Sequence, residues 1–385
     1  MTTQIISAPV EATLHKVSVW SSLPTFKNSW PGLLAIVTLS VICGLPGVPW
    51  PFTVYELLRY VDQVLPPIYG KGLFIDLLHF NYVVIGLTVG LLIRNIIGVP
   101  KSWEPGLSYT AVFMNTGIIM LGSQYMLRDL VRLGGQSILV MVIMVFGCAT
   151  ALVFIGKLFK LEPRLTAILA AAFSLCGVSA AVAIAPMVRA KSEEVAYAIA
   201  ALVSFGLVCL FGMPVLGRLL EIPPYHFGIL SATGVPNSAQ VIATGFNYSF
   251  EAGKVAGFAN IGRIVLIPAG VLFIYFLALT QEFKKEKISA WVVVKEKFPI
   301  FVFGFILVWA MNCLHLWPKP ATQAMEVMMT WFFTLCFVGL GMQTKFSDMM
   351  KAGVSGIAVG YAAGTLKVVA ALGLIYVFWK SGFMK

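Results

Sequence analysis

Long apolar stretches separated by short polar loops recur along almost the whole chain. A helix needs about 20 apolar residues to cross the hydrocarbon core of a bilayer. The stretches keep their apolar character from end to end and do not alternate as strands do. The pattern therefore predicts an all-α polytopic membrane protein with about nine to eleven transmembrane helices. The stretches fall near residues 32–49, 73–98, 107–126, 136–157, 165–188, 195–218, 227–246, 255–281, 298–316, 325–343 and 352–379.

The composition supports the same class. Hydrophobic residues make up 59% of the chain and charged residues 11%, and the mean hydropathy is +0.90. A soluble domain carries about 25% charged residues, so a soluble multidomain protein is excluded. The net charge of +11 is spread singly through loops, without the basic and aromatic patches of a nucleic-acid-binding protein. The six cysteines lie in or beside apolar stretches and form no CxxC pair, so we expect buried thiols and no metal or cofactor.

The polar segments divide the chain into four parts. Residues 1–30 form an N-terminal tail without the pattern of a cleavable signal peptide, and residues 31–281 form the main membrane domain. A loop at 282–297 carries five lysines, and residues 298–385 form a three-span end. The positive-inside rule places the basic loop and the N-terminal tail in the cytoplasm and the C-terminus in the periplasm.

Two stretches of the chain match at a constant offset of 219. They are GIIMLGSQYMLRDLVRLGG at 117–135 and CFVGLGMQTKFSDMMKAGV at 336–354. An odd number of crossings separates the copies, so the match predicts an inverted repeat, the usual plan of secondary transporters. The shared residues are Leu121/Leu340, Gly122/Gly341, Gln124/Gln343, Asp129/Asp348 and Gly134/Gly353.

A weaker match has an offset of 57. It relates SLCGVSAAVAIA at 174–185 to SATGVPNSAQVI at 231–242. Runs of small residues resemble one another easily, so this match is less specific than the first. If both matches reflect repeats, the second copy is circularly permuted relative to the first.

The same two segments are the best candidates for a binding site. They are rich in glycine, serine and threonine, and each has a proline within or at the end of it, Pro236 and Pro186. Such residues let a helix unwind at membrane depth, and the opposed half-helix N-termini offer N–H groups to an anion. We expect two broken or re-entrant helices at the bilayer midplane and leave open whether each crosses fully. The alternative is that the small residues only allow close helix packing. The candidate ligands of a substrate are Ser174, Gly177, Ser179, Thr233, Gly234, Asn237, Ser238 and Gln240.

Arg263 and Lys367 are charges placed inside otherwise apolar spans. An ionisable residue within the membrane is costly unless it is paired, and no acidic residue lies mid-span to pair with either. An anionic substrate or a cavity lined by carbonyl groups accounts for both, and we add both residues to the candidate substrate site. For Lys367 the alternative is a side chain that snorkels to the interface.

These residues resemble a known family. The run SLCGVSAAVAIAPMVRAKSEEVAYAIA at 174–200, with SAQVIATG at 238–245 and GRIVLIPAG around Arg263, is similar to the YeiH-like sulfate exporter family over about residues 75 to 375. The resemblance implies a transporter of the bacterial inner membrane, related to the cation/proton antiporter and anion transporter superfamily. Pro236, Asn237 and Ser238 replace a His-Asp-Thr-like triplet, which puts proton coupling through that position in doubt.

The sequence thus predicts a secondary active transporter of a small anion, such as sulfate, sulfite or an organosulfonate, that works by alternating access. The alternative is a sodium-coupled carboxylate carrier with a sodium site near Asn237 and Gln240. A channel is less favoured, and a membrane enzyme lacks any metal cluster or nucleophile–base pair. Substrate, direction, coupling ion (H⁺ or Na⁺) and assembly as a homodimer stay open. The expected partners are the anion and the bilayer.

Overall fold

The computed structural model describes residue 24 and residues 26–45, 53–64, 81–278, 300–347 and 354–381, and every regular element in these ranges is helical. The first part contains α2 (Phe26–Cys43), α3 (Val54–Val64), α4 (Tyr82–Leu92), η2 (Ile93–Ile97), α5 (Glu104–Leu107), α6 (Thr110–Leu121), η3 (Gly122–Gln124) and α7 (Leu127–Leu158). The middle contains α8 (Pro163–Ser174), α9 (Val178–Ile184), α10 (Ser192–Leu219), α11 (Pro224–Gly234), α12 (Ser238–Tyr248), α13 (Phe250–Val265) and α14 (Ile267–Leu277). The last part contains α16 (Phe301–Cys313), α17 (Lys319–Gln343) and α19 (Val354–Lys380). The loop predicted at 282–297 lies outside the described residues.

The helices confirm a polytopic membrane protein. Within the described ranges, five helices are long and apolar enough to cross a bilayer, and the bent pair α13 and α14 would make a sixth. Single long helices therefore account for only part of the nine to eleven predicted crossings. Other predicted apolar segments contain helices that are shorter or interrupted. The five long spans are Phe26–Cys43, Ser137–Leu158, Glu193–Leu219, Pro320–Gln343 and Ala358–Lys380.

One interruption was not predicted. The apolar stretch 255–281 reads as a continuous span, but the helix axis bends by 52° between α13 and α14. Pro268 lies in the first turn of α14. A proline lacks the N–H that the helix ladder needs and crowds the preceding turn, which accounts for the bend. The bend directly follows Arg263, which lies in the last turn of α13.

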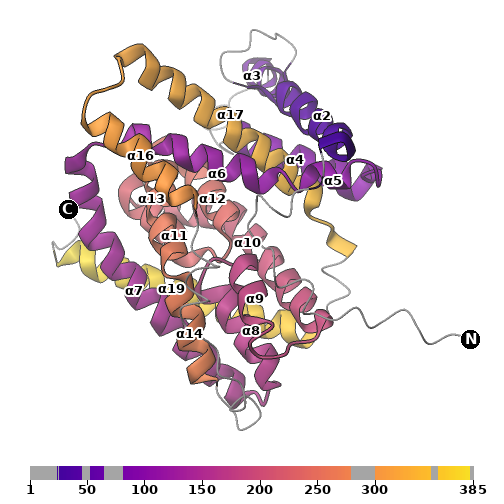
Figure 1. Cartoon of the computed structure of the whole chain (residues 1–385), viewed down its shortest axis with the longest axis vertical. Helices are drawn as coiled ribbons and strands as arrows, with labels where there is room; N and C mark the ends of the chain where they lie inside the picture. The colour runs from indigo at the N-terminus through magenta and orange to yellow at the C-terminus, as the bar shows by residue number, and fades with distance from the viewer. Residues whose placement is uncertain are drawn as a thin grey trace, which may run out of the picture.

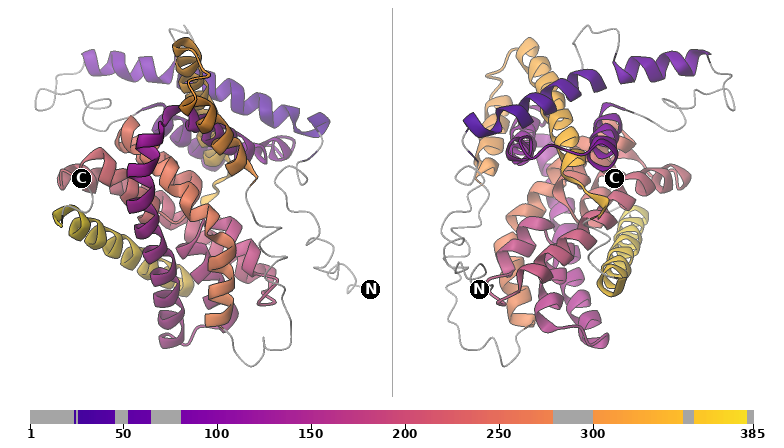
Figure 2. Two further views of the ribbon diagram at one scale, coloured as in Figure 1. Left: turned by 60° about the vertical axis from the view of Figure 1, so that its left-hand side comes forward. Right: turned by 90° about the vertical axis from the view of Figure 1, so that its right-hand side faces the viewer.

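The helices pack as two groups (Figure 1). A smaller group of α2, α4, α6, α16 and α17 lies at one end of the molecule, with α2 and α3 along its edge in Figure 2. A larger group contains α7 to α14 and α19. The contacts between the groups include those of α12 with α4 and α17. Asn81 caps the start of α4 and donates its amide to the carbonyl oxygen of Phe246 at 2.8 Å, which joins α4 to α12.

The repeat of offset 219 is inverted in the structure. A Cβ at Gly339 would lie 2.4 Å from Thr110 Oγ1, and one at Gly117 would lie 2.7 Å from the ring of Phe333. The residue numbers on α6 rise as those on α17 fall, so the two copies run antiparallel. The offset also relates Tyr82, where α4 begins, to Phe301, where α16 begins.

The two copies make reciprocal contacts. A Cβ at Gly341 would lie 2.4 Å from a main-chain oxygen of α4, and one at Gly122 would lie 2.6 Å from a main-chain oxygen of α16. One asparagine in η2, directly after α4, and one in α16 also bind the residue that follows the other copy's second helix or 3-10 turn. Asn95 donates to the carbonyl of Thr344, and Asn312 donates to that of Tyr125, both at 3.0 Å. The acceptors Tyr125 and Thr344 are 219 residues apart, whereas the donors Asn95 and Asn312 are 217 apart, so the acceptors are equivalent and the donors lie two residues out of register.

Candidate functional site

Helices α8 and α9 form a re-entrant hairpin, hairpin 1, comprising residues 163–189. Arg164 at the start of α8 approaches the carbonyl oxygen of Arg189, beyond α9, to 3.4 Å. The chain therefore leaves on the side where it entered. The tip of hairpin 1 is residues 175–177, where Gly177 has a φ of +86° that favours glycine.

Helices α11 and α12 form a second hairpin, hairpin 2, comprising residues 222–248. At its base the rings of Phe227 and Tyr248 stack with centroids 3.9 Å apart, and the Tyr248 hydroxyl donates to the carbonyl of Ile222. Nearer the tip, Ser231 Oγ donates to the carbonyl of Val241 at 2.7 Å. An unbroken helix would separate residues ten apart by about 15 Å. Both segments are thus hairpins rather than full crossings.

The hairpins enter from opposite ends of the larger group. Helix α10 has 28 residues and connects the base of hairpin 1 to the base of hairpin 2, a span of about 42 Å. The tips meet near the middle of α10. A Cβ on Gly177 would lie 3.2 Å from both Asn237 Cα and Leu202 Cδ2, and Gln240 Nε2 donates to the carbonyl of Val203 at 3.0 Å.

The meeting of the tips revises the weaker sequence match. Helix α9 begins at Val178 and α12 begins at Ser238, so the breaks correspond at an offset of 60 rather than 57. The sequence alignment is therefore displaced by one helical turn. The counterpart of Gly177 at the tip is Asn237, the N-cap of α12, rather than Gly234, the last residue of α11.

Arg263 lies against the tip of hairpin 2 and is 1% exposed. Its Nη1 donates to the carbonyls of Ala232 and Val235 at 3.1 and 2.6 Å, and its Nη2 donates to Asn260 Oδ1 at 3.1 Å. The guanidinium thus caps the C-terminal end of α11, where carbonyl groups lack helical partners and the helix dipole is negative.

Lys367 has the corresponding role at hairpin 1. It is 2% exposed, and its Nζ donates to the carbonyl of Phe173 at 2.5 Å, in the last turn of α8. The first half of each hairpin therefore ends on a buried cation from a neighbouring helix. Among the residues that the structure describes, the ion pairs are Arg59–Glu56 and Arg94–Glu104. Arg263 and Lys367 therefore form no ion pair with any carboxylate in this part of the chain. Both cations thus donate to carbonyl groups, one of the two environments that the sequence predicted, and their role in binding a substrate stays a prediction.

Several fully buried polar atoms around hairpin 2 have no hydrogen-bond partner. Burying such a group without a partner costs free energy, and most buried polar groups in proteins avoid it. Unpaired groups that lie together offer hydrogen bonds to a water molecule or a ligand. Within the described part of the chain, these atoms include Ser238 Oγ, Gln240 Oε1, Asn260 Nδ2 and Arg263 Nε.

Asn260 is the site residue that the sequence analysis missed. It is fully buried, and one side of its amide orients Arg263 while the other side is unpaired. The available signal was its position three residues before Arg263, because residues three apart lie on the same face of a helix.

The remaining predicted site residues divide into two sets. Ser174 and Thr233 donate to the carbonyls of their own preceding turns, at 2.5 and 2.8 Å, which ties up their hydroxyl hydrogens. Ser179 is exposed, and Gly234 packs against Met213, whose Cε would lie 3.2 Å from a Cβ on the glycine. The structure thus gathers Gly177, Asn237, Ser238, Gln240 and Arg263 at the tips, and places Lys367 on the flank of hairpin 1.

The side chains proposed for sodium have separate partners. Asn237 Oδ1 accepts from the N–H of Ala239 at 3.3 Å, while Gln240 binds α10. Gln240 Oε1 lies against Gly206, where a Cβ would come within 1.8 Å of it. No group of three or more His, Cys, Asp or Glu residues able to hold a metal ion occurs in the ranges that the structure describes.

Two re-entrant hairpins that meet tip to tip inside a helical bundle define this protein as a polytopic membrane protein with broken helices in its interior. The chain belongs to the family described as conserved hypothetical protein 698, whose model matches residues 64–360. The predicted resemblance is confirmed to the extent that this family is one of membrane proteins.

Two similar proteins come from Nitratidesulfovibrio vulgaris, and both are named UPF0324 membrane protein. One is 35% identical over 98% of this chain and 99% of its own length, and the other is 36% identical over 85% and 92%. A UPF0324 membrane protein of Clostridium tetani is 23% identical over 88% of this chain and 94% of its own length. No solved structure matches the chain. These names identify membrane proteins and state no substrate.

Proposed function

We propose that this protein is a secondary active transporter of a small anion, which binds where the tips of hairpins 1 and 2 meet. The observation that carries the proposal is the contact between Gly177 and Asn237, near the middle of α10. Broken helices that meet at the midplane of an inverted repeat are the common way to build a substrate site accessible from either side in turn.

The charges around the tips favour an anion. Arg263 is buried and is paired with carbonyl groups and an amide rather than with a described carboxylate. Its Nε–H, the amide of Asn260 and the hydroxyl of Ser238 are donors without partners in the described part of the chain. The N-terminus of α12 lies at the same tip and contributes its positive end and the main-chain N–H groups of its first turn, of which that of Ala239 is bonded to Asn237 Oδ1.

The division into two helix groups supports alternating access. The hairpins belong to the larger group, and contacts between α12 and the helices α4 and α17 connect it to the smaller group. A movement of one group against the other would expose the tips first to one side of the membrane and then to the other. The inverted repeat makes the two end states structurally similar.

The resemblance to YeiH-like sulfate exporters gives the substrate class: sulfate, sulfite or an organosulfonate. We place the protein in a bacterial inner membrane, with its N-terminus in the cytoplasm and its C-terminus in the periplasm, because this orientation keeps the lysines of 282–297 inside. The proposed activity is transport, with no covalent step assigned to the protein. Assembly as a homodimer is compatible with this function and is not required by it.

The test is anion flux into proteoliposomes that contain the purified protein. Arg263→Gln removes the charge. Arg263→Lys keeps the charge but loses the planar guanidinium that donates to two carbonyl groups. We expect the Gln variant to lose at least about tenfold of the radiolabelled sulfate or sulfite flux, which corresponds to about 1.4 kcal/mol, and the Lys variant to keep part of it. Arg94→Gln is the control, because Arg94 pairs with Glu104 beside α4 in the smaller helix group, away from the hairpin tips. Unchanged flux in folded Arg263→Gln protein would exclude the proposed role.

Coupling to sodium is the second candidate, on the ground that Gln240 Oε1 is a buried acceptor without a partner in the described residues. A sodium-coupled carboxylate carrier would lose flux when choline replaces sodium. An exporter that is proton-coupled or uncoupled would keep its flux. Measuring sulfate and dicarboxylate flux in both salts separates the two functions.

A further inference from the structure

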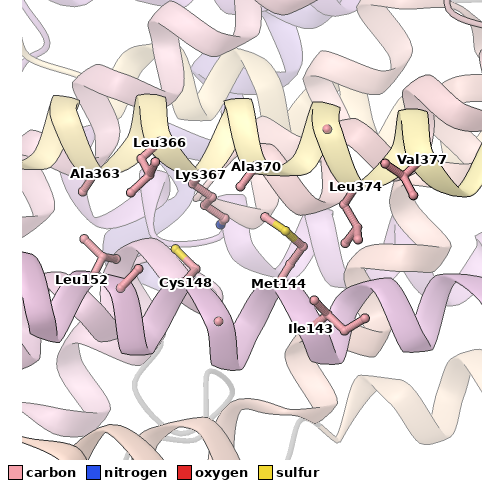
Figure 3. A pocket seen from close by; sticks show the side chains of 13 residues that line it. Ile143, Met144, Cys148, Leu152, Ala363, Leu366, Lys367, Ala370, Leu374 and Val377 are labelled. Atoms are coloured by element: carbon pink, nitrogen blue, oxygen red, sulfur yellow. The ribbon is translucent and has the colours of Figure 1, made fainter.

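A cavity of about 440 Å³ lies between α7 and α19, and its lining includes Lys367, whose ammonium binds the end of α8. Figure 3 shows its two walls, with Cys148 and Met144 on α7 facing Lys367 and Leu374 on α19. Small residues create the space. A Cβ placed on Gly147 or Gly373 would meet no atom within 4 Å.

The cavity opens toward the surface that faces lipid. Three lining residues on its rim are well exposed: Ile143 by 42%, Leu366 by 46% and Val377 by 58%. Exposed apolar side chains on spanning helices lie in hydrocarbon in a membrane protein. A molecule can therefore reach the cavity sideways from the bilayer without passing through the site at the hairpin tips.

Lys367 is the one charged residue in the lining. An ammonium group has three donors, and the hydrogen bond found for Lys367 Nζ in the described structure goes to the carbonyl of Phe173. The offset of 219 that relates α7 to α19 pairs Lys367 with Cys148, so the equivalent position on the other wall carries no charge. The cavity is therefore apolar with a single positive centre.

We propose that this cavity binds a lipophilic weak acid, such as a long-chain fatty acid, with its carboxylate on Lys367 and its alkyl chain along the apolar walls. The charge is complementary, and each buried methylene contributes about 0.8 kcal/mol. Lys367 lies near the middle of α19. The headgroup of a phospholipid is held at the interface and does not reach that depth, whereas a fatty acid has no larger headgroup and can place its carboxylate at the ammonium of Lys367.

Binding at this cavity acts on hairpin 1. The ammonium of Lys367 holds the carbonyl of Phe173, at the end of α8, and a carboxylate in the cavity shares the same ammonium. The ligand thereby alters the hydrogen bond that holds the first half of hairpin 1, and through it regulates the tip of hairpin 1. The binding site itself does not depend on the proposed transport function, so it is tested by binding alone.

The experiment is photolabelling of the purified protein in lipid nanodiscs with a diazirine analogue of palmitic acid. We expect saturable labelling of peptides from α7 and α19 that palmitate displaces and methyl palmitate does not. Lys367→Gln should weaken the binding of the acid at least about tenfold, which corresponds to 1.4 kcal/mol. Gly147→Leu should also block labelling, because it fills the cavity where no neighbour resists a side chain.

Each alternative result overturns the proposal in a distinct way. Equal competition by the methyl ester would show that acyl chains fill the cavity without using Lys367. Competition by phosphatidylglycerol as strong as that by palmitate would identify a phospholipid site. Unsaturable labelling, or labelling that Gly147→Leu leaves unchanged, would place the acid elsewhere. The Gly147 variant keeps the test valid if Lys367→Gln fails to fold.

Discussion

Gly177 and Asn237 lie in contact although sixty positions separate them in the chain: a Cβ on Gly177 would be 3.2 Å from Asn237 Cα. Each is the residue that precedes the second half of its hairpin, α9 or α12. Their contact joins two segments that enter the bundle from opposite ends. The second halves of both hairpins therefore start from one point inside the membrane.

Gly177→Val should separate the hairpin tips. The φ of +86° disfavours a side chain, and the added atoms would press on Asn237 and Leu202. We expect a loss of stability of about 1–3 kcal/mol and a larger proportional loss of anion flux. Thermal unfolding in detergent and proteoliposome flux measure the two effects. Flux at the wild-type level in this variant would show that transport does not need the contact.

Gly206→Ala should disturb hairpin 2 through Gln240. The new Cβ would lie 1.8 Å from Gln240 Oε1 and 2.5 Å from Gln240 Cδ, so the side chain must leave its bond to Val203. Overpacking of this kind costs about 1–3 kcal/mol. Gly212→Ala on the same helix is the matched control, because its Cβ would meet nothing within 4 Å. Equal melting temperatures for both variants would contradict the observed packing of Gln240.

Gly122→Ala and Gly341→Ala should destabilise the protein to a similar degree. The two glycines are equivalent in the inverted repeat, and each added methyl would lie within 2.6 Å of a main-chain oxygen on the neighbouring helix. We expect a loss of about 1–3 kcal/mol for either change, read from thermal unfolding in detergent. A large effect for one glycine and none for the other would mean that the reciprocal contacts do not carry equal weight.

The hairpin bases should be accessible from opposite sides of the membrane. Lys191 and Glu221 flank α10 at its two ends, and both are exposed. In a protein whose six cysteines are replaced, Lys191→Cys and Glu221→Cys should react with a membrane-impermeant maleimide from different sides. In the orientation that we propose from the positive-inside rule, Lys191 should be labelled from the cytoplasmic side. Labelling of both from one side would disprove the opposed arrangement of the hairpins.

Local composition was sufficient to identify some of these features. Apolar runs in the chain must be buried in lipid or protein, so the class and most helix positions follow from hydropathy. Gly177 and Pro236 mark the breaks because neither residue favours a continuing helix at those positions. The repeat of offset 219 was visible because five residues, among them Gly122 and Gly341, are identical in the two copies.

Other features depended on contacts between distant segments. The bend after Arg263 was missed because a proline within an apolar run is compatible with an unbroken span. The sequence showed two buried cations but not that Arg263 binds hairpin 2 and Lys367 binds hairpin 1. Asn260 was overlooked because an asparagine in a helix acquires a role only from its neighbours.

The sequence by itself determined that this is a membrane protein of helical spans with an inverted repeat and two interrupted segments, because bilayer thickness and backbone hydrogen bonding act on each segment alone. Only the tertiary structure decided that both segments fold back as hairpins and that their tips meet at Gly177 and Asn237. A glycine or proline allows the chain to break, but the direction in which it continues depends on the helices packed around it. Those helices also decide which carbonyl groups the buried cations reach.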